Sequence, residues 1–307
     1  MMIPGSTVTG LIVRDGKVCG VKIDEEEFEA DIVISAEGVN ALCAERSGLI
    51  RTASPKDMAV GFKYVYQLPE QIINDRFNCE SGNGVALLAA GACSRGVSGG
   101  AFLYTNKDSI SLGVVVDTEG WKASKIPMAS FGEEFKQHPA IARYIEGGEL
   151  IEYSAHLIPE GGLKSLPQLY ADGFMITGDA AGFVVNRGLT VRGMDYAIIS
   201  GIAAAEAADE ALAAGDFSKN SLHRSQANLT PLILSDLETM KNSHDYIAHS
   251  KLMFTAYPEL ITGIMRNLYA VDGAATKKAL GLVKQSIPKN ISYLDLVKDA
   301  IKGGTSL

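Results

Sequence analysis

The segment Asp172–Asp195, DGFMITGDAAGFVVNRGLTVRGMD, decides the fold class of this chain, because it reads as a strand, a loop and a helix start in immediate succession. Phe174 to Thr177 form a short apolar run, which is typical of a buried strand. The loop Gly178-Asp179-Ala180-Ala181-Gly182 carries almost no side-chain bulk, so another molecule can approach its backbone closely. Ala197 to Ala214 is rich in Ala, Ile and Gly and predicts a helix buried on much of its surface.

This order of elements favours a ligand site. A strand end, a small-residue turn and a helix N-terminus together suit a polar, partly anionic ligand, because the first amides of a helix have no partner inside it. An ordinary turn beside a small-residue helix would explain Gly178-Asp179 taken alone, since short motifs recur by chance. The longer window favours the ligand site: Gly188 follows GDAAG by six residues, and Gly193 directly precedes Met194-Asp195 at the expected helix start.

A second segment of the same kind lies near the start of the chain. Val8–Ile23, VTGLIVRDGKVCGVKI, predicts a hairpin around Asp15-Gly16. Ala30–Ser35 (ADIVIS) then predicts a strand that runs into Ala36-Glu37-Gly38-Val39-Asn40. A meander with a polar turn would give the same local pattern.

Together these segments resemble the flavin-binding fingerprints of FAD-dependent oxidoreductases of the hydroxylase and reductase superfamily. In that superfamily the Asp of the Gly-Asp pair accepts a hydrogen bond from a ribityl hydroxyl, a role that falls here to Asp179. The glycine at the helix start, here Gly193, lets backbone N–H groups point at the flavin N1 and O2 edge. Reduction places negative charge on that edge, so a helix N-terminus stabilises the reduced form. The residue before Gly38 is usually Asp, and this chain departs from the pattern with Glu37.

More narrowly, three stretches are similar to the FixC family, which is related to electron-transfer-flavoprotein:quinone oxidoreductases and, more distantly, to geranylgeranyl reductases. They are GVNALCAERSGL at Gly38–Leu49, IPEGG at Ile158–Gly162 and TVRGMDYAIISGIAAAEA at Thr190–Ala207. The resemblance implies FAD as the cofactor and no catalytic acid, base or nucleophile on the chain itself. The implied cofactor-binding residues are Gly178, Asp179, Ala180, Ala181, Gly182, Gly188, Thr190, Val191, Arg192, Gly193, Met194 and Asp195.

The implied fold class is α/β, or α+β overall, with an incomplete FAD-binding Rossmann-like domain, an inserted antiparallel-sheet domain and a C-terminal helical region. We expect the FAD-binding domain at residues 1–48 and 169–215, the inserted domain at 49–168 and the helical region at 216–307. Four apolar or alternating runs predict the inserted sheet, which in the family covers the flavin ring: Ala59–Leu68, Val85–Ala90, Gly100–Thr105 and Ser109–Val116. Pro159 to Gly162 lies at the ring or forms a plain interdomain turn.

The chain departs from the family at its start. Family members begin with a βαβ unit carrying G-x-G-x-x-G, which holds the FAD pyrophosphate. No such hexapeptide occurs here, so roughly the first hundred residues of a family domain are expected to be missing. We expect a fragment, a partner half encoded elsewhere, or a late start of the reading frame. FAD binding by this chain alone is therefore not implied.

Composition excludes several function classes. A hydrophobic content of 47% in 307 residues predicts a folded chain with a sizeable core, and the net charge of -8 argues against nucleic acid as a partner. No apolar run is long enough to span a membrane and no signal peptide is recognisable, which favours the cytoplasm. Cys19, Cys43, Cys79 and Cys93 lack iron–sulfur spacing, and the five histidines lack a metal pattern, so no metal site is expected. The resemblance implies that the iron–sulfur cluster is carried by a separate ferredoxin-like subunit, as in FixC-like proteins, and not by this polypeptide.

The C-terminal region carries an apolar stripe and a local positive charge. Leu260, Ile261, Ile264, Met265, Leu268 and Tyr269 repeat on one helical face, and we expect this stripe to be core. From Lys251 onward eight Lys or Arg stand against four Asp or Glu, a local charge of +4. A solvated helical surface is the preferred interpretation. The sharper one is a docking face for an acidic partner or for lipid headgroups, with peripheral attachment at the inner face of the cell membrane.

The resemblance implies an FAD-dependent oxidoreductase that passes electrons from the electron-transfer flavoprotein subunits to a quinone. Arg192, placed in TVRGMD, is either a surface charge or a group that offsets negative charge on reduced flavin; we favour the second interpretation. A prenyl-chain (geranylgeranyl) reductase is the rival enzyme, and it would need a long apolar tunnel beside the ring. A non-catalytic remnant or interaction module that cannot bind FAD alone is the third alternative.

Overall fold

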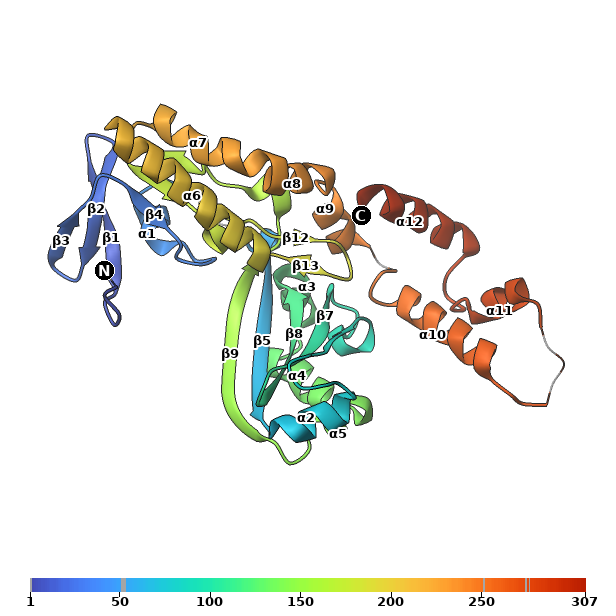
Figure 1. Ribbon diagram of the computed structural model, residues 1–307. Coiled ribbons are helices and arrows are strands. Elements are labelled where there is room, and N and C mark those ends of the chain that lie inside the picture. Colours follow the sequence, from blue (N-terminus) through green and yellow to red (C-terminus); the bar gives the residue numbers. More distant parts are fainter. Residues whose placement is uncertain (1, 51–53, 251, 274, 276) are drawn as a thin grey trace. The chain divides into compact units, whose positions relative to one another are not determined.

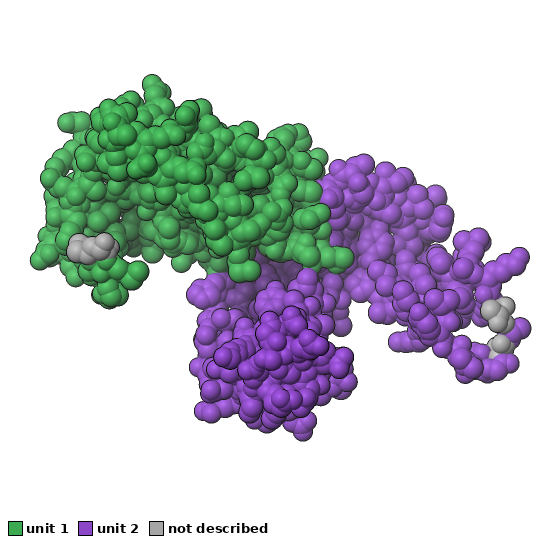
Figure 2. All heavy atoms as spheres, viewed as in Figure 1, with its two compact units in different colours: residues 1–58, 157–244 green, residues 59–156, 245–307 purple. Residues whose placement is uncertain are grey.

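A computed structural model describes residues 2–50, 54–250, 252–273, 275 and 277–307 (Figure 1). The chain divides into two compact units, each built from two separate stretches of sequence (Figure 2). Unit 1 comprises Met1–Met58 and Leu157–His244, and unit 2 comprises Ala59–His156 and Asp245–Leu307. The division into four segments that the sequence predicts remains a prediction. It differs in kind from the two compact units that the structure shows.

Unit 1 contains the two flavin-like segments. Its elements are β1 (Val8–Arg14), β2 (Lys17–Ile23), β3 (Glu26–Glu29), β4 (Val33–Ser35), α1 (Leu42–Arg46), β10 (Tyr170–Ala171), β11 (Phe174–Ile176), β12 (Val185–Asn186), β13 (Val191–Arg192), α6 (Met194–Ala214), α7 (Lys219–Leu229) and α8 (Ser235–Thr239). A π-helical turn at Thr230–Leu234 separates α7 from α8.

The two predicted strands of unit 1 lie side by side and run parallel. β4 pairs with β11 in the register Val33 with Phe174, Met175 with Ile34 and Ile176 with Ser35. The ladder continues past both strands, since the Thr177 N–H donates to the Ser35 carbonyl at 2.9 Å. Because parallel strands end at the same edge of a sheet, the loops that follow Ser35 and Thr177 emerge next to each other.

The hairpin predicted around Asp15-Gly16 is confirmed. β1 and β2 pair antiparallel from Val8 with Ile23 to Arg14 with Lys17, and β3 extends this sheet on the other side of β2. The Val18 N–H donates to the Asp172 carbonyl at 2.9 Å, which ties the hairpin to the turn before β11.

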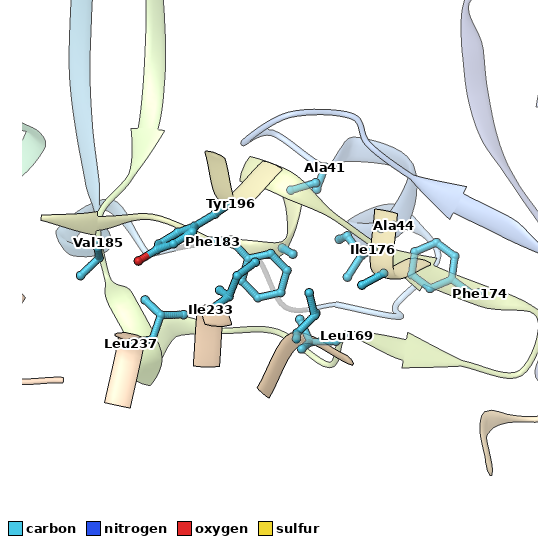
Figure 3. Close-up of a cluster of buried hydrophobic side chains, with 14 of the residues drawn as sticks. Ala41, Ala44, Leu169, Phe174, Ile176, Phe183, Val185, Tyr196, Ile233 and Leu237 are labelled. Atoms are coloured by element: carbon cyan, nitrogen blue, oxygen red, sulfur yellow. The ribbon is translucent and has the colours of Figure 1, made fainter. Parts of the chain in front are cut away.

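Strand β11 is buried on both of its faces. Phe174 and Ile176 belong to a core cluster with Phe183, Tyr196 and Ile233 (Figure 3), whereas Met175 packs in a second cluster with small residues of α6. This explains why β11 reads as a continuous apolar run rather than an alternating one. In the second cluster Ala204, Ala207 and Ala211 pack with Leu222 of α7, and their small size lets α6 and α7 approach closely.

Helix α6 is buried on one face only. The sequence predicts burial over much of its surface, but Ile198 is 67% exposed and Ile202 is 55% exposed on the outer face. A composition rich in Ala, Ile and Gly indicates that a helix can be buried. Which faces of the helix are covered depends on the positions of the neighbouring elements.

Unit 2 is built on the predicted antiparallel sheet. Its elements are β5 (Met58–Gln67), α2 (Glu70–Phe77), β6 (Ala86–Ala89), β7 (Gly99–Thr105), β8 (Ser109–Asp117), α3 (Thr118–Ser124), α4 (Met128–Gln137), α5 (Pro139–Ile145), β9 (Glu149–Pro159), α9 (Ser243–His249), α10 (Ala256–Tyr269), α11 (Ala279–Ser286) and α12 (Tyr293–Ser306), with β5, β9 and α9 crossing the unit boundary. The strand order is β6-β7-β8-β5-β9, and all four predicted strands are present.

One face of this sheet carries the core of unit 2. Alternate residues of β8, among them Ile110, Leu112 and Val114, are fully buried with Phe62 and Phe131. Helices α2, α3 and α4 pack against β8 and supply this cover. In these strands the apolar residues that recur at every second position lie on the face of the sheet that the helices cover.

The helical C-terminal region is confirmed, but its apolar stripe is not core. Ile261, Met265, Leu268 and Tyr269 are each more than half exposed. α10 packs against α11, where Asn267 donates to Ser286 Oγ at 2.9 Å; Leu260 and Ile264 of the stripe are partly buried, and its other four residues are exposed. A helical period shows that residues share a face without showing what lies opposite it. Among the residues described, no helix combines the length and apolarity needed to cross a membrane.

Three hydroxyl groups converge on one carboxylate in the C-terminal region. Asp299 of α12 accepts hydrogen bonds from Tyr246 and Tyr257, both at 2.9 Å, and from Ser250 at 3.3 Å. Burial and the bond to Asp299 raise the pKa of Tyr246 and of Tyr257. The carboxylate therefore joins α9, α10 and α12 through buried hydroxyls.

Replacing Asp299 by Ala should lower the free energy of unfolding by about 1–3 kcal/mol, because the buried Tyr246 hydroxyl loses its acceptor. Urea denaturation followed by circular dichroism measures this change. Glu259→Gln removes an exposed carboxylate on α10 and serves as the control. Equal stability of the two variants would show that the three hydroxyls do not depend on Asp299.

Candidate functional site

The loop after β11 is bound to helix α6 by a hydrogen bond. It forms a short 3-10 helix, Gly178–Ala181, in which Gly178 has φ of 61°. This left-handed conformation favours glycine, and a Cβ there would also lie 3.5 Å from the Ala197 side chain. The Gly178 N–H donates to the buried Ser200 hydroxyl at 3.0 Å. The loop backbone is therefore held against the first turns of α6.

Asp179 is the polar side chain that this loop presents. It is half-buried, and no described residue donates a hydrogen bond to its carboxylate. Burial raises the pKa of Asp179 above its ordinary value because a desolvated carboxylate is less stable in its charged form. No described side-chain oxygen is both buried and unpartnered, so this carboxylate is open to the pocket, and an ionisable group with a shifted pKa in a pocket is a candidate binding residue.

Asp179 lines a pocket of about 520 Å³, a size typical of small-molecule sites. Ala180 and Gly182 line it as well, so three of the predicted residues meet there. The remaining walls come from three other stretches of unit 1: the loop and helix at Val39–Leu42, Glu45, Leu49 and Ile50; Ser54, Asp57 and Met58; and Leu157, Pro159 and Ser165–Gln168. The two flavin-like segments, which are far apart in the sequence, thus share one pocket through the parallel pairing of β4 and β11.

The start of α6 adjoins the same carboxylate. A Cβ on Gly193 would lie 4.0 Å from Asp179 Oδ1 and 3.1 Å from a methyl group of Val184, so this position requires a small residue. The next residue, Met194, is 87% exposed, and no side chain caps the helix start. The first amides of α6 are therefore open beside Asp179, as an anion-binding helix start requires.

The other predicted residues lie around this centre and not on the pocket wall. Gly178 and Ala181 belong to the loop after β11 and are buried. Gly188 and Thr190 belong to the turn of the β12–β13 hairpin, where the Gly188 N–H donates to Asn186 Oδ1 at 2.8 Å, and Val191 is exposed on β13. The structure thus brings Asp179, Ala180 and Gly182 together with the start of α6, and it places the hairpin residues further out.

Arg192 is ion-paired, an arrangement that neither sequence interpretation described. Its Nη2 and Nε lie 2.6 and 3.0 Å from Asp195 Oδ2, and its Nη1 donates to Asp236 Oδ2. Its guanidinium carbon lies 4.6 Å from the centre of the Tyr196 ring. The alternative of a surface charge without a salt-bridge partner is wrong, because Asp195 and Asp236 both pair with this cation. A role toward flavin remains a prediction.

Glu37 has a local role that the sequence comparison did not reveal. Its carboxylate accepts hydrogen bonds from the Ser35 hydroxyl at 2.8 Å and from the Cys43 N–H at 2.8 Å, at the start of α1. Burial alone would raise the pKa of Glu37, but these hydrogen bonds outweigh it and lower the pKa. Glu37 therefore caps the helix that forms one wall of the pocket.

Sequence reasoning also missed an ionisable pair at the pocket edge. Asp57 lines the pocket, and its Oδ1 lies 3.6 Å from His244 Nε2. These residues stand far apart in the sequence without a recognisable spacing, so no local signal could have found them. All four cysteines are free thiols, and burial raises the pKa of the Cys43 thiol to about 11. Within the described ranges, no group of side chains could hold a metal ion.

The residues present fit the flavin that the resemblance implies. Asp179 accepts no hydrogen bond from a described residue and could accept one from a ribityl hydroxyl, and the start of α6, which no side chain caps, adjoins it. The small residues Ala180 and Gly182 leave room for a bulky group against the backbone. The chemistry of this donor and acceptor set is therefore that of a polyhydroxylated, anionic cofactor.

Comparison with known proteins gives concordant matches over the whole chain. Residues 58–158 match the family described as ETF-QO, ubiquinone-binding, and residues 244–307 match the ETF-QO/FixC family C-terminal domain. The chain is 41% identical over 309 residues to protein FixC of Escherichia coli strain K12, covering 100% of this chain and 71% of that protein. It is 42% identical over 306 residues to the probable electron transfer flavoprotein-quinone oxidoreductase YdiS of the same strain, covering 99% of this chain and 71% of that protein.

A solved structure shows the same fold. A geranylgeranyl bacteriochlorophyll reductase-like protein from Thermoplasma acidophilum superposes with a TM-score of 0.65 at 17% identity, covering 97% of this chain and 69% of that one. Fold and comparisons together define an oxidoreductase of the FAD-dependent class. The chain belongs to the ETF-QO/FixC family, the family of electron transfer flavoprotein-quinone oxidoreductases and FixC proteins.

Replacing Glu37 by Gln should lower the free energy of unfolding at pH 7 by about 1 kcal/mol, the usual worth of a helix-capping side chain. Because the pKa of Glu37 is lowered in the folded state, its contribution is present above the ordinary carboxyl pKa and is lost as the pH falls through the folded pKa. The difference from wild type should therefore shrink between about pH 5 and pH 3.

Urea denaturation at pH 7 and at low pH measures this difference. Glu25→Gln removes an exposed carboxylate from a turn and is the matched control. A Glu37→Gln variant as stable as the control at pH 7 would contradict the capping role.

Proposed function

We propose that this chain forms the flavin and quinone parts of an oxidoreductase that takes electrons from an electron-transfer flavoprotein and passes them through FAD to a quinone. The observation that carries this proposal is the unpartnered Asp179 carboxylate beside the open start of α6, in a member of the ETF-QO/FixC family. FAD, when bound, supplies the redox chemistry, and the protein contributes binding and electrostatics.

The residues of the loop and helix start divide the binding task. Asp179 accepts the hydrogen bond of a ribityl hydroxyl, and Ala180 and Gly182 pack on the ribityl-phosphate region, with Ala181 buried behind them. The amides of Met194 and Asp195 face the N1 and O2 edge of the flavin and stabilise negative charge there. The wall formed by α1 and Pro159 limits the access of water to the pocket.

The family and its named members support the partners. The match of residues 58–158 to a ubiquinone-binding family supports a quinone acceptor, and the similarity to YdiS supports an electron-transfer flavoprotein as donor. The free cysteines, without iron–sulfur spacing, are in keeping with a cluster on a separate ferredoxin-like subunit.

The exposed stripe of α10 is the surface that we propose for peripheral contact with the membrane that holds the quinone. Ile261, Met265 and Leu268 project from a region whose local charge from Lys251 onward is +4. An apolar face beside basic residues suits an anionic lipid surface.

Replacing Asp179 by Asn should have opposite effects on stability and on FAD binding. Without flavin the variant should be slightly more stable, because a half-buried carboxylate loses its charge, and solvent screening keeps this gain small. Because burial raises the folded pKa of Asp179, its cost exists above that pKa and vanishes as the pH falls through it, so the gain should disappear at acid pH. FAD binding should weaken about tenfold, because the strongest ribityl acceptor is lost.

Thermal unfolding of the flavin-free chain and titration of FAD fluorescence measure the two effects. Asp31→Asn, at an exposed position of unit 1, is the control and should change neither. A variant that binds FAD as tightly as wild type would remove Asp179 from the site.

Reoxidation of the reduced flavoprotein separates the proposed function from its rival. Addition of a short-chain ubiquinone should reoxidise the flavin, and reduced electron-transfer flavoprotein should reduce it again, as followed by absorbance under anaerobic conditions. Reoxidation by a geranylgeranyl substrate and not by ubiquinone would favour a prenyl reductase, in line with the Thermoplasma structure. Failure to bind FAD at all would favour a non-catalytic interaction module.

A further inference from the structure

A group of four charged and aromatic side chains joins the start of α6 to α8 within unit 1. Arg192 on β13 binds Asp195 in the first turn of α6, and it also binds Asp236 of α8. The Tyr196 hydroxyl donates to the same Asp236 oxygen at 2.8 Å. Asp236 is 40 positions beyond Tyr196 in the sequence, so only the tertiary fold brings it to this corner.

Asp236 contacts one residue just before α6, Arg192, and one residue within its first turn, Tyr196. Tyr196 is only 1% exposed and belongs to the core cluster with Phe183 and Leu237 (Figure 3). Its ring packs under the Arg192 guanidinium, and its hydroxyl is held by Asp236. Burial and the bond to Asp236 raise the pKa of the Tyr196 hydroxyl, so it remains a donor. Gly193, which adjoins Asp179, lies directly between Arg192 and the helix.

We propose that Asp236 is a positioning residue of the cofactor site: through Arg192 and Tyr196 it fixes the helix start beside Asp179 and sets the local charge there. This inference rests on the proposed flavin site. Two carboxylates around one guanidinium leave a net negative charge next to the amides of α6. Negative charge near the ring opposes reduction, so Asp236 and Arg192 influence the flavin midpoint potential in opposite directions.

Paired substitutions separate this role from a merely structural one. Asp236→Ala and Arg192→Ala break the same ion pair, but the first removes a negative charge and the second removes a positive one. We expect Asp236→Ala to raise the flavin midpoint potential and Arg192→Ala to lower it, both measured on the FAD-loaded full chain. Glu238→Ala is the matched control, because it removes a carboxylate of the same helix that is bound to Lys241.

Hydrogen exchange of the flavin-free chain tests the positioning directly. The Ala197 N–H donates to the Gly193 carbonyl at 2.8 Å and closes the first turn of α6. Its exchange should become about three- to tenfold faster in Asp236→Ala and stay unchanged in Glu238→Ala. Asp236→Asn keeps an acceptor oxygen without the charge, so it should restore slow exchange while keeping the raised potential.

The outcomes decide the two proposals separately. Unchanged exchange in Asp236→Ala, or potentials that shift in the same direction in both alanine variants, would overturn the role of Asp236. Faster exchange in a chain that fails to bind FAD would leave Asp236 as the residue that positions the turn and would overturn the flavin assignment alone. Asp236→Asn also serves as the variant that keeps the fold if the alanine variant does not.

Discussion

The parallel pairing of β4 with β11 is the constraint on which the rest of unit 1 depends. It places two loops, one after Ser35 and one after Thr177, at the same edge of a sheet. Each loop is then held by a different device. Glu37 caps α1 on one side, and Ser200 of α6 holds the backbone of Gly178 on the other. The pocket exists because both devices act at one edge, and neither loop would form it alone.

The polar groups of this pocket show a division between structure and ligand binding. Glu37 has donors and a lowered pKa, whereas Asp179 has no donor from the described residues and a raised pKa. The carboxylates of the two loops therefore differ in what they contribute to folding: Glu37 stabilises the chain, whereas burial disfavours the charged form of Asp179, a cost that a bound ligand can offset. Arg192 follows a third pattern, since it is paired with two carboxylates, Asp195 and Asp236.

Much of the fold could be predicted because its signals are local. The hairpin around Asp15-Gly16, the strand at Phe174–Ile176 and the four strands of the antiparallel sheet follow from turn residues and from short apolar or alternating runs. The Gly-Asp pair before a small-residue helix carried the resemblance to flavoproteins, and the family comparison agrees with it. The C-terminal stripe was misjudged because periodicity identifies a helical face without identifying its neighbour.

The sequence by itself determined the elements, the family and the candidate residues, because strand and helix periods, turn residues and short motifs are properties of neighbouring positions. The tertiary structure alone decided which groups are satisfied. Asp236 pairs with Arg192, Asp57 pairs with His244, and Asp179 accepts no hydrogen bond from the residues that the structure describes. Hydrogen bonds and ion pairs act over a few ångströms in space, and positions far apart in the chain carry no local record of those distances.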